Sequence, residues 1–177
     1  STVQPIDAAV TLSVIWIGLG VAGLAFMRAP RVITGILFPA GAVVSLALAA
    51  AGLWALGTPA SSAILPAGLP GLPFHVRVDA LSGFFLLLLG GVASGISLFA
   101  AGYFRDTDAT VLGLLSLQYH VFLASMAFVL IADDAYLFMI AWESMALSSY
   151  FLVTSEHHDE NNRKAGFEYF LLERFEA

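Results

Sequence analysis

Five long runs of apolar residues, separated by shorter polar stretches, make up most of the chain. A helix needs roughly 20 apolar residues to cross a bilayer core about 30 Å thick, and each run is about that long. Backbone polar groups in lipid must be paired within the segment itself, so each run is predicted to be a transmembrane helix. The predicted spans cover residues 8–27, 32–56, 79–103, 112–132 and 135–154.

A membrane β-barrel and a cleaved signal peptide both fit these runs poorly. The strands of a barrel are short and alternate between apolar and polar residues, whereas residues 81–104 are almost continuously apolar. The first run lacks the basic start and the short apolar segment of a cleaved signal peptide, so it is expected to remain as a helix. The sequence therefore predicts an all-α integral membrane protein, with residues 1–177 forming a single helical domain.

The longest connection, residues 57–78, contains four prolines and three glycines, which prevents either flanking helix from continuing through it. Its FHVRV end, residues 74–78, is predicted to form a short strand. Asp79 then begins the third helix, where a carboxylate can accept hydrogen bonds from free N–H groups. An N-cap role is the structural prediction for this residue.

The charges of the connections indicate how the helices are oriented. One side of the predicted membrane has five basic residues, whereas the other has Arg77 together with the acidic turn Asp133–Asp134. The excess of Lys and Arg on cytoplasmic loops then places the N-terminus outside. The five basic residues are Arg28, Arg31, Arg105, Arg163 and Lys164.

Composition supports a membrane protein and excludes several kinds of chemistry. The chain is 59% hydrophobic and 11% charged, and its mean hydropathy is +0.89. A net charge of −6 without a basic cluster argues against nucleic-acid binding. The absence of cysteine excludes iron–sulfur ligation, and a membrane haem would need two histidines at matched depth, whereas only His120 lies within a span. No cofactor is expected.

Glu143 is an acid near the middle of the fifth predicted span, about 12 Å from its outer end at ~1.5 Å per residue. A charged residue at the centre of a membrane helix costs about 2.5–3.5 kcal/mol, so this carboxyl needs a polar partner or a proton. We expect a protonatable station. The alternative is a neutral acid that holds the bundle together by hydrogen bonding to a neighbouring helix. Helical spacing places Ala141, Ser144 and Ser148 on a different, small-residue face.

His120 is the second ionisable residue predicted to lie inside the membrane. Counting helical rises places it within about 4–6 Å of Glu143 in depth, so a proton relay between the two is allowed. Spacing does not show whether they face each other, and a histidine bonded to Ser116 or Gln118 is the alternative. These are the two candidate proton-transfer residues, and no catalytic or metal-binding residue is assigned.

Three weaker possibilities remain open. His157, His158 and Asp159 could bind a metal, although a solvated loop is the simpler interpretation. The final residues, 167–177, are predicted to form an interfacial helical stub or a cut-off sixth span. A quinone or small-molecule site would need a cavity near Tyr103, Tyr119 or Tyr150, but tyrosines near helix ends are usually interface anchors.

Two stretches resemble the antiporter-like membrane subunits of respiratory complex I, Mrp antiporters and membrane-bound hydrogenases. They are RVDALSGFFLLLLGGVASGISLFAAGYF, residues 77–104, and DDAYLFMIAWESMALSSYFLV, residues 133–153. FHVRVDALSGFF and ESMALSSYFLV are most similar to hydrogenase-4 component B, also called formate hydrogenlyase subunit 3. The five predicted spans and the outside N-terminus agree with the family's first five helices.

The resemblance implies that Glu143 corresponds to a family glutamate that pairs with a lysine on a later helix. The chain has one lysine, Lys164, and it lies in the inner loop, so the cationic partner is expected to be missing. The ending ERFEA also departs from the family pattern. We therefore expect the N-terminal part of a longer subunit.

The resulting hypothesis is a proton-translocating subunit of a membrane-bound hydrogenase or an NADH-quinone-oxidoreductase-like complex, with no redox centre of its own. Its expected partners are other membrane subunits, a peripheral redox arm and the lipid bilayer, and its expected location is the inner, cytoplasmic membrane. The alternative is a non-transporting scaffold or assembly subunit of such a complex.

Overall fold

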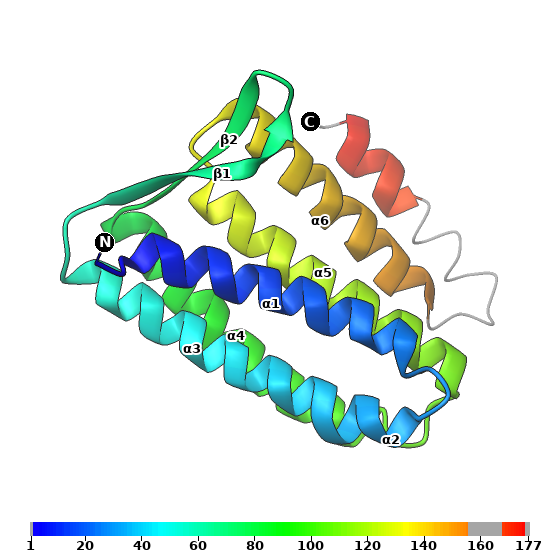
Figure 1. Ribbon diagram of the computed structural model, residues 1–177. Helices are drawn as coiled ribbons and strands as arrows, with labels where there is room; N and C mark the ends of the chain where they lie inside the picture. The colour runs from blue at the N-terminus through cyan, green and yellow to red at the C-terminus, as the bar shows by residue number, and fades with distance from the viewer. Residues whose placement is uncertain (1, 156–167, 176–177) are drawn as a thin grey trace.

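The computed structural model describes residues 2–155 and 168–175 and shows a bundle of long helices with a β-hairpin at one end (Figure 1). Residues 168–175 are helical and lie beside α6. The residues of the predicted metal site, His157, His158 and Asp159, are outside the described residues. In chain order, the labelled helices are α1 (Pro5–Ala25), α2 (Pro30–Val32), η1 (Ile33–Leu37), α3 (Phe38–Leu56), α4 (Ala80–Tyr103), α5 (Ala109–Ile131) and α6 (Ala135–Ser155).

Four helical segments of the described chain are long and apolar enough to cross a membrane: Pro5–Ala25, Pro30–Leu56, Ala80–Tyr103 and Ala109–Ile131. Each lies within a few residues of a predicted span. The fifth predicted span, α6, is 21 residues long but is not among them. Its glutamate, serines and tyrosines make it less apolar than the other four.

The second span is a continuous helix with a π-helical turn near its start. In this turn, η1, the N–H of Phe38 reaches back five residues to the carbonyl of Ile33. Pro39 follows, and a proline inside a helix has no N–H and its ring crowds the carbonyl four residues earlier. A π-turn accommodates such a defect without ending the helix.

Small residues bring α3 and α4 into close contact. A Cβ atom added to Gly52 would lie 2.5 Å from the carbonyl oxygen of Gly83, and one added to Gly83 would lie 2.8 Å from that of Gly52. The two backbones therefore touch directly at this crossing, as is common between membrane helices. On the other side of the bundle, α1 packs along α5, and α6 packs on α5 as the outermost of the long helices.

A two-stranded antiparallel hairpin, β1 (Ser61–Leu69) and β2 (Leu72–Val78), covers one end of the bundle (Figure 1). Its turn is Pro70–Gly71, with Gly71 at φ +78°, which fits a type II turn. The predicted strand at residues 74–78 is confirmed as part of β2. The all-α prediction missed the hairpin, because β1 is a partner strand whose pairing no local pattern indicates.

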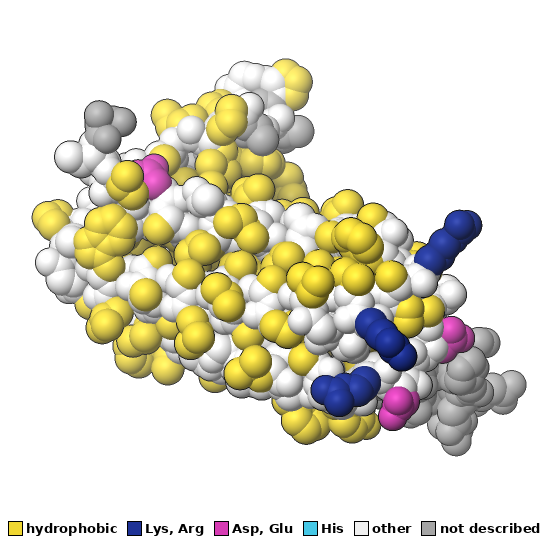
Figure 2. Space-filling view, turned by 60° about the horizontal axis from the view of Figure 1, so that its bottom comes forward, with side chains coloured by type: hydrophobic (Ala, Val, Ile, Leu, Met, Phe, Trp, Pro, Cys, Tyr) yellow, Lys and Arg dark blue, Asp and Glu magenta, His cyan; other side chains and the backbone are white. Residues whose placement is uncertain are grey.

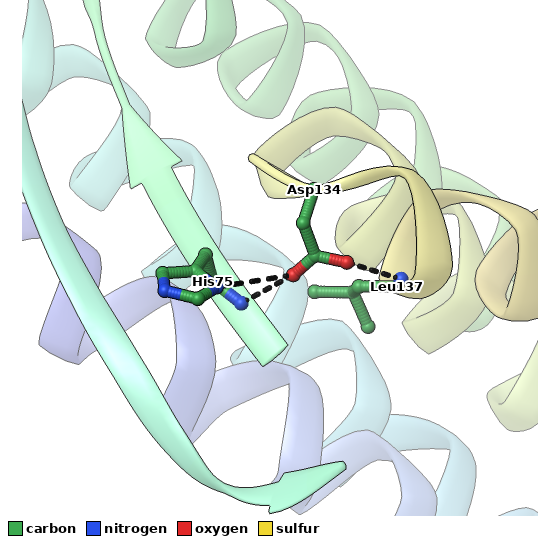
Figure 3. A network of polar contacts seen from close by, with 3 residues as sticks. All are labelled: His75, Asp134 and Leu137. Atoms are coloured by element: carbon green, nitrogen blue, oxygen red, sulfur yellow. Dashed lines mark hydrogen bonds and ion pairs between the residues drawn. The ribbon is translucent and has the colours of Figure 1, made fainter. Parts of the chain in front are cut away.

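The hairpin is attached to the helices by both apolar and polar contacts. Val76 and Val78 are almost fully buried against the bundle. Figure 3 shows the Asp134 carboxylate between β2 and the start of α6: one oxygen accepts from the backbone N–H of His75 at 2.5 Å, the other from that of Leu137 at 2.7 Å. The predicted Asp79 cap is also confirmed, since its carboxylate accepts from Ser82 N–H at 2.9 Å.

The end of the bundle opposite the hairpin is the arginine end, defined by Arg28, Arg31 and Arg105. All three side chains are exposed. Figure 2 shows arginine side chains gathered at one end of an otherwise apolar face, with acidic side chains beside them. The arginines at this end are three of the five basic residues that the sequence places on one side of the predicted membrane.

Candidate functional site

Glu143 lies on the outward face of α6, and its side chain is 47% exposed. The described part of the chain therefore does not bury this carboxylate. Two other residues of the same face are also exposed, Met139 and Leu147. Ala141 and Ser148 are buried instead and Ser144 is half-buried, so the small residues are less exposed than the face that carries Glu143, as predicted.

Arg174 forms an ion pair with Glu143, with its Nη1 donating to Oε2. The arginine comes from the helical residues 168–175, and its side chain is 52% exposed. Phe170, one turn earlier, contacts Tyr150 of α6 with ring centroids 5.1 Å apart. The guanidinium also lies 6.0 Å from the centre of the Phe170 ring. The expectation that this chain lacks a cationic partner for Glu143 is therefore wrong.

The missed partner is an arginine, whereas the family resemblance implies a lysine. A guanidinium differs from an ammonium in two ways that matter here. It can hold a carboxylate through two parallel N–H groups, and it does not lose its proton in proteins. The signal in the sequence was the run FEYFLLERFEA, where a charged residue follows an apolar stretch.

His120 is fully buried within α5. Its Nδ1 lies 2.8 Å from the carbonyl oxygen of Ser116 and 3.3 Å from the Ser116 hydroxyl. A carbonyl can only accept, so Nδ1 donates, and in the neutral imidazole Nε2 is then an acceptor. Nε2 is buried and has no hydrogen-bond partner among the described residues. The hydrogen bond to Ser116 that the alternative interpretation required is thus present.

The unpaired nitrogen of His120 lies beside a glycine whose carbonyl accepts hydrogen bonds from two buried side chains. A Cβ added to Gly41 of α3 would lie 2.6 Å from Nε2, so the imidazole packs directly against the α3 backbone. The Gly41 carbonyl accepts from the Ser45 hydroxyl at 2.7 Å and from Trp16 Nε1 at 3.4 Å. Both of these side chains are fully buried. Residues from α1, α3 and α5 therefore meet at a polar centre inside an apolar bundle.

The structure does not bring His120 and Glu143 together. Three residues of α5 line grooves together with residues of α6: Ser125, Met126 and Val129. At 3.6 residues per turn, these three residues lie roughly 140–240° around the α5 axis from His120. His120 thus faces α1 and α3, while α6 packs on the opposite side of α5. No hydrogen bond or ion pair joins the two candidate residues in the described ranges, 2–155 and 168–175.

Gln118 is a polar residue that the sequence indicated only as a possible partner of His120. Its side-chain Oε1 is buried without a hydrogen-bond partner among the residues described. By the same count of helical turns it lies on the α6 side of α5, not beside His120. A glutamine inside a predicted span was the available signal, because polar residues within membrane helices usually face protein.

Comparisons with known proteins are consistent with these helices. No protein-family model matches the chain. Over 112 residues, 62% of this chain, it is 35% identical to NADH-quinone oxidoreductase subunit L of Mycobacterium tuberculosis (strain ATCC 25618 / H37Rv). Over 97 residues, 55% of this chain, it is 32% identical to hydrogenase-4 component B of Escherichia coli (strain K12).

The chain is homologous to the antiporter-like membrane subunits. Subunit L of Pseudomonas aeruginosa is a further relative, 31% identical over 101 residues, which are 57% of this chain. The chain covers only 14% to 17% of the length of these relatives. The resemblance to the antiporter-like family that the sequence predicted is confirmed, and two of the three branches named for it, complex I and the membrane-bound hydrogenases, are represented among these relatives.

Proposed function

We propose that the chain is the N-terminal part of a proton-translocating subunit in a membrane-bound hydrogenase or an NADH-quinone-oxidoreductase-like complex. Homology to the antiporter-like subunits supports this proposal. Oxidation and reduction take place in partner subunits of a peripheral arm, and this chain handles protons. Its other partners are membrane subunits of the same complex.

The ion pair between Glu143 and Arg174 is the observation that carries the proposal. Both groups belong to helical segments, and a charged pair inside a bilayer is stable only while the charges compensate each other. Opening the pair leaves an uncompensated carboxylate in a medium of low dielectric constant, and taking up a proton removes that charge. Glu143 thereby holds a proton when the pair is open and releases it when the pair closes.

His120 is the second proton station of the proposal. Its acceptor, Nε2, faces α3 across Gly41, on the side of α5 away from Glu143. It therefore serves a path along the α1–α3 side of the bundle and does not exchange protons with Glu143 by direct contact. The buried hydroxyl of Ser45 and the indole N–H of Trp16 are polar groups along that path.

The proposed position in the membrane includes α6 as a fifth span. At about 1.5 Å per residue its 21 residues are about 31 Å long, which is enough to cross the hydrocarbon core. The arginine end then lies in the cytoplasm and the N-terminus and hairpin lie outside, following the positive-inside bias. The membrane is the inner, cytoplasmic one.

The second candidate function is a non-transporting scaffold or assembly subunit. The observation that favours it is the identity of the partner of Glu143. An arginine stays charged throughout, so it can neutralise the carboxylate permanently and lock α6 to the residues 168–175. In that case the pair contributes to assembly and takes no part in proton movement.

The experiment is the substitution Glu143→Gln in the complete complex, reconstituted into vesicles. We expect redox turnover and assembly to be retained while proton transfer falls at least about tenfold, because the amide cannot release a proton. Met139→Leu, one turn away on the same exposed face, is the matched control. Unchanged proton transfer in Glu143→Gln would overturn the role of Glu143 as a proton station, and loss of assembly would favour the scaffold.

Arg174 supplies a second arm that separates the two functions. A moving pair needs a cation, so Arg174→Lys should keep proton transfer while Arg174→Gln should abolish it. If the pair is purely structural, the charge at position 174 does not affect proton transfer. Any Arg174 variant that still assembles should then transfer protons at the rate of the unmodified complex. The assembled fraction is measured in both cases by the yield of intact complex.

A further inference from the structure

We propose that the arginine end of the bundle binds an anionic phospholipid, with one acyl chain in an aromatic groove beside α4 and its phosphodiester against Arg31 and Arg105. The groove has a volume of about 480 Å³. Its lining includes Phe38 of α3 and Phe99, Tyr103 and Phe104 at the end of α4. Volumes of roughly 300–1,000 Å³ are typical of sites that hold a small molecule.

The walls of the groove are aromatic rings held by contacts with one another. Phe99 and Tyr103 are stacked at 5.2 Å, and Tyr103 meets Phe104 edge-on at 5.0 Å. Phe104 in turn stacks on Phe38 at 6.3 Å, which joins the end of α4 to the start of α3. Phe99 and Tyr103 are both 66% exposed on the apolar outer face of α4. The groove therefore opens toward the surface that faces lipid.

The chemistry of the lining favours a hydrocarbon chain over a polar ring. Tyr119 is a lining residue with a polar group, and its hydroxyl lies 2.7 Å from the hydroxyl of Ser97, which is fully buried. That hydroxyl already has a partner, so a quinone-like ligand would gain little from it. Tyr103 stands at the end of its helix, the position where tyrosine anchors a helix in the headgroup region.

The charges at the rim of the groove select the headgroup. Arg105 directly follows Phe104, and Arg31 precedes Phe38 by seven residues, or about 10 Å along the helix. Both side chains are exposed, and neither forms an ion pair with any described residue. Asp106 and Asp108 follow Arg105 but are likewise unpaired in the described ranges. Unpaired guanidinium groups just beyond an apolar groove complement a phosphodiester, which they bind through paired N–H groups.

The test uses a tryptophan placed in the groove by Phe99→Trp in the complete complex. Quenching is taken as the difference from the complex without this substitution, because the chain already has Trp16, Trp54 and Trp142. The complex is reconstituted into vesicles of phosphatidylcholine with a fixed small fraction of brominated phosphatidylglycerol or brominated phosphatidylcholine, since bromine on the acyl chain quenches nearby tryptophan. The usual attraction between one arginine and an anionic membrane surface corresponds to about a fivefold preference for the anionic lipid for each arginine. We expect stronger quenching by the brominated anionic lipid, and no preference after Arg31→Gln with Arg105→Gln.

Arg77→Gln, at the hairpin end, is the control that should keep the preference. Equal quenching by the two brominated lipids would overturn the proposal. Absence of quenching by both lipids would also overturn it, and would mean that a protein partner or a second copy covers the groove. If Phe99→Trp prevents assembly, the proposal is tested by native mass spectrometry of the complex without this substitution. The proposal then requires that Arg31→Gln combined with Arg105→Gln lowers the amount of anionic lipid retained by the complex. Neither readout depends on proton transfer by Glu143.

Discussion

The carboxylate of Asp134 accepts a hydrogen bond from the backbone N–H of His75, a residue 59 positions earlier in the chain. The same carboxylate accepts from Leu137 N–H, in the first turn of α6. Next to it, the backbone N–H of Asp133 donates to the carbonyl of His75 at 2.9 Å. One side chain thus both caps α6 and attaches the hairpin, so the position of the helix that contains Glu143 depends on the hairpin.

Removing this carboxylate should loosen both elements. Asp134→Ala leaves two backbone N–H groups without their acceptor, and we expect the free energy of unfolding to fall by about 1–3 kcal/mol. The measurement is thermal unfolding in detergent, combined with hydrogen exchange of the hairpin amides. Asp133→Ala is the control, because the exposed side chain of Asp133 forms no hydrogen bond among the described residues. Equal effects of the two substitutions would contradict this role of Asp134.

Two carboxylates outside the membrane spans should make stability sensitive to acid. The hydrogen bond from the Ser82 backbone lowers the pKa of Asp79. For Asp134, partial burial raises the pKa, but hydrogen bonds from the His75 and Leu137 backbones outweigh it and the net shift is downward. A group with a lowered pKa stabilises the folded state above the unfolded value, about 3.9, and this contribution is lost as the pH falls through the folded value.

We therefore expect the unfolding temperature to be constant from about pH 7 to 5 and to fall below about pH 4. Asp79→Asn keeps an acceptor at the helix cap but does not titrate, so it should flatten this acid decline. Unfolding curves of the unmodified chain and of Asp79→Asn between pH 3 and 7 check the prediction. Parallel declines would show that other groups cause the loss.

The contact between His120 and Gly41 should tolerate no added methyl group. In Gly41→Ala the new Cβ would meet three atoms of the His120 ring, the nearest at 2.6 Å, and we expect a loss of about 1–3 kcal/mol. Gly35→Ala is the matched control earlier in the same span, where an added Cβ meets nothing within 4 Å. Because the clash is with His120 alone, Gly41→Ala should cost much less in a His120→Ala background, and a double-mutant cycle measures this coupling. Additive effects would contradict it.

The helices and their ends could be predicted from the sequence because their causes are local. An apolar run of sufficient length forms a helix in lipid whatever its neighbours are, and a proline-rich connection stops it. The Asp79 cap depends on a residue three positions away, which is also local. The homology to the antiporter-like subunits was likewise visible in two continuous stretches, residues 77–104 and 133–153.

The sequence therefore predicted three things: the apolar helices, the two different faces of α6 and the family. Three relationships became visible only in the folded protein: β1 pairs with β2, His120 turns toward α3 and not toward α6, and Arg174 is the partner of Glu143. All three have the same cause. Each depends on which face of an element meets a segment distant in the chain, and helical or strand periodicity describes a face without specifying its partner.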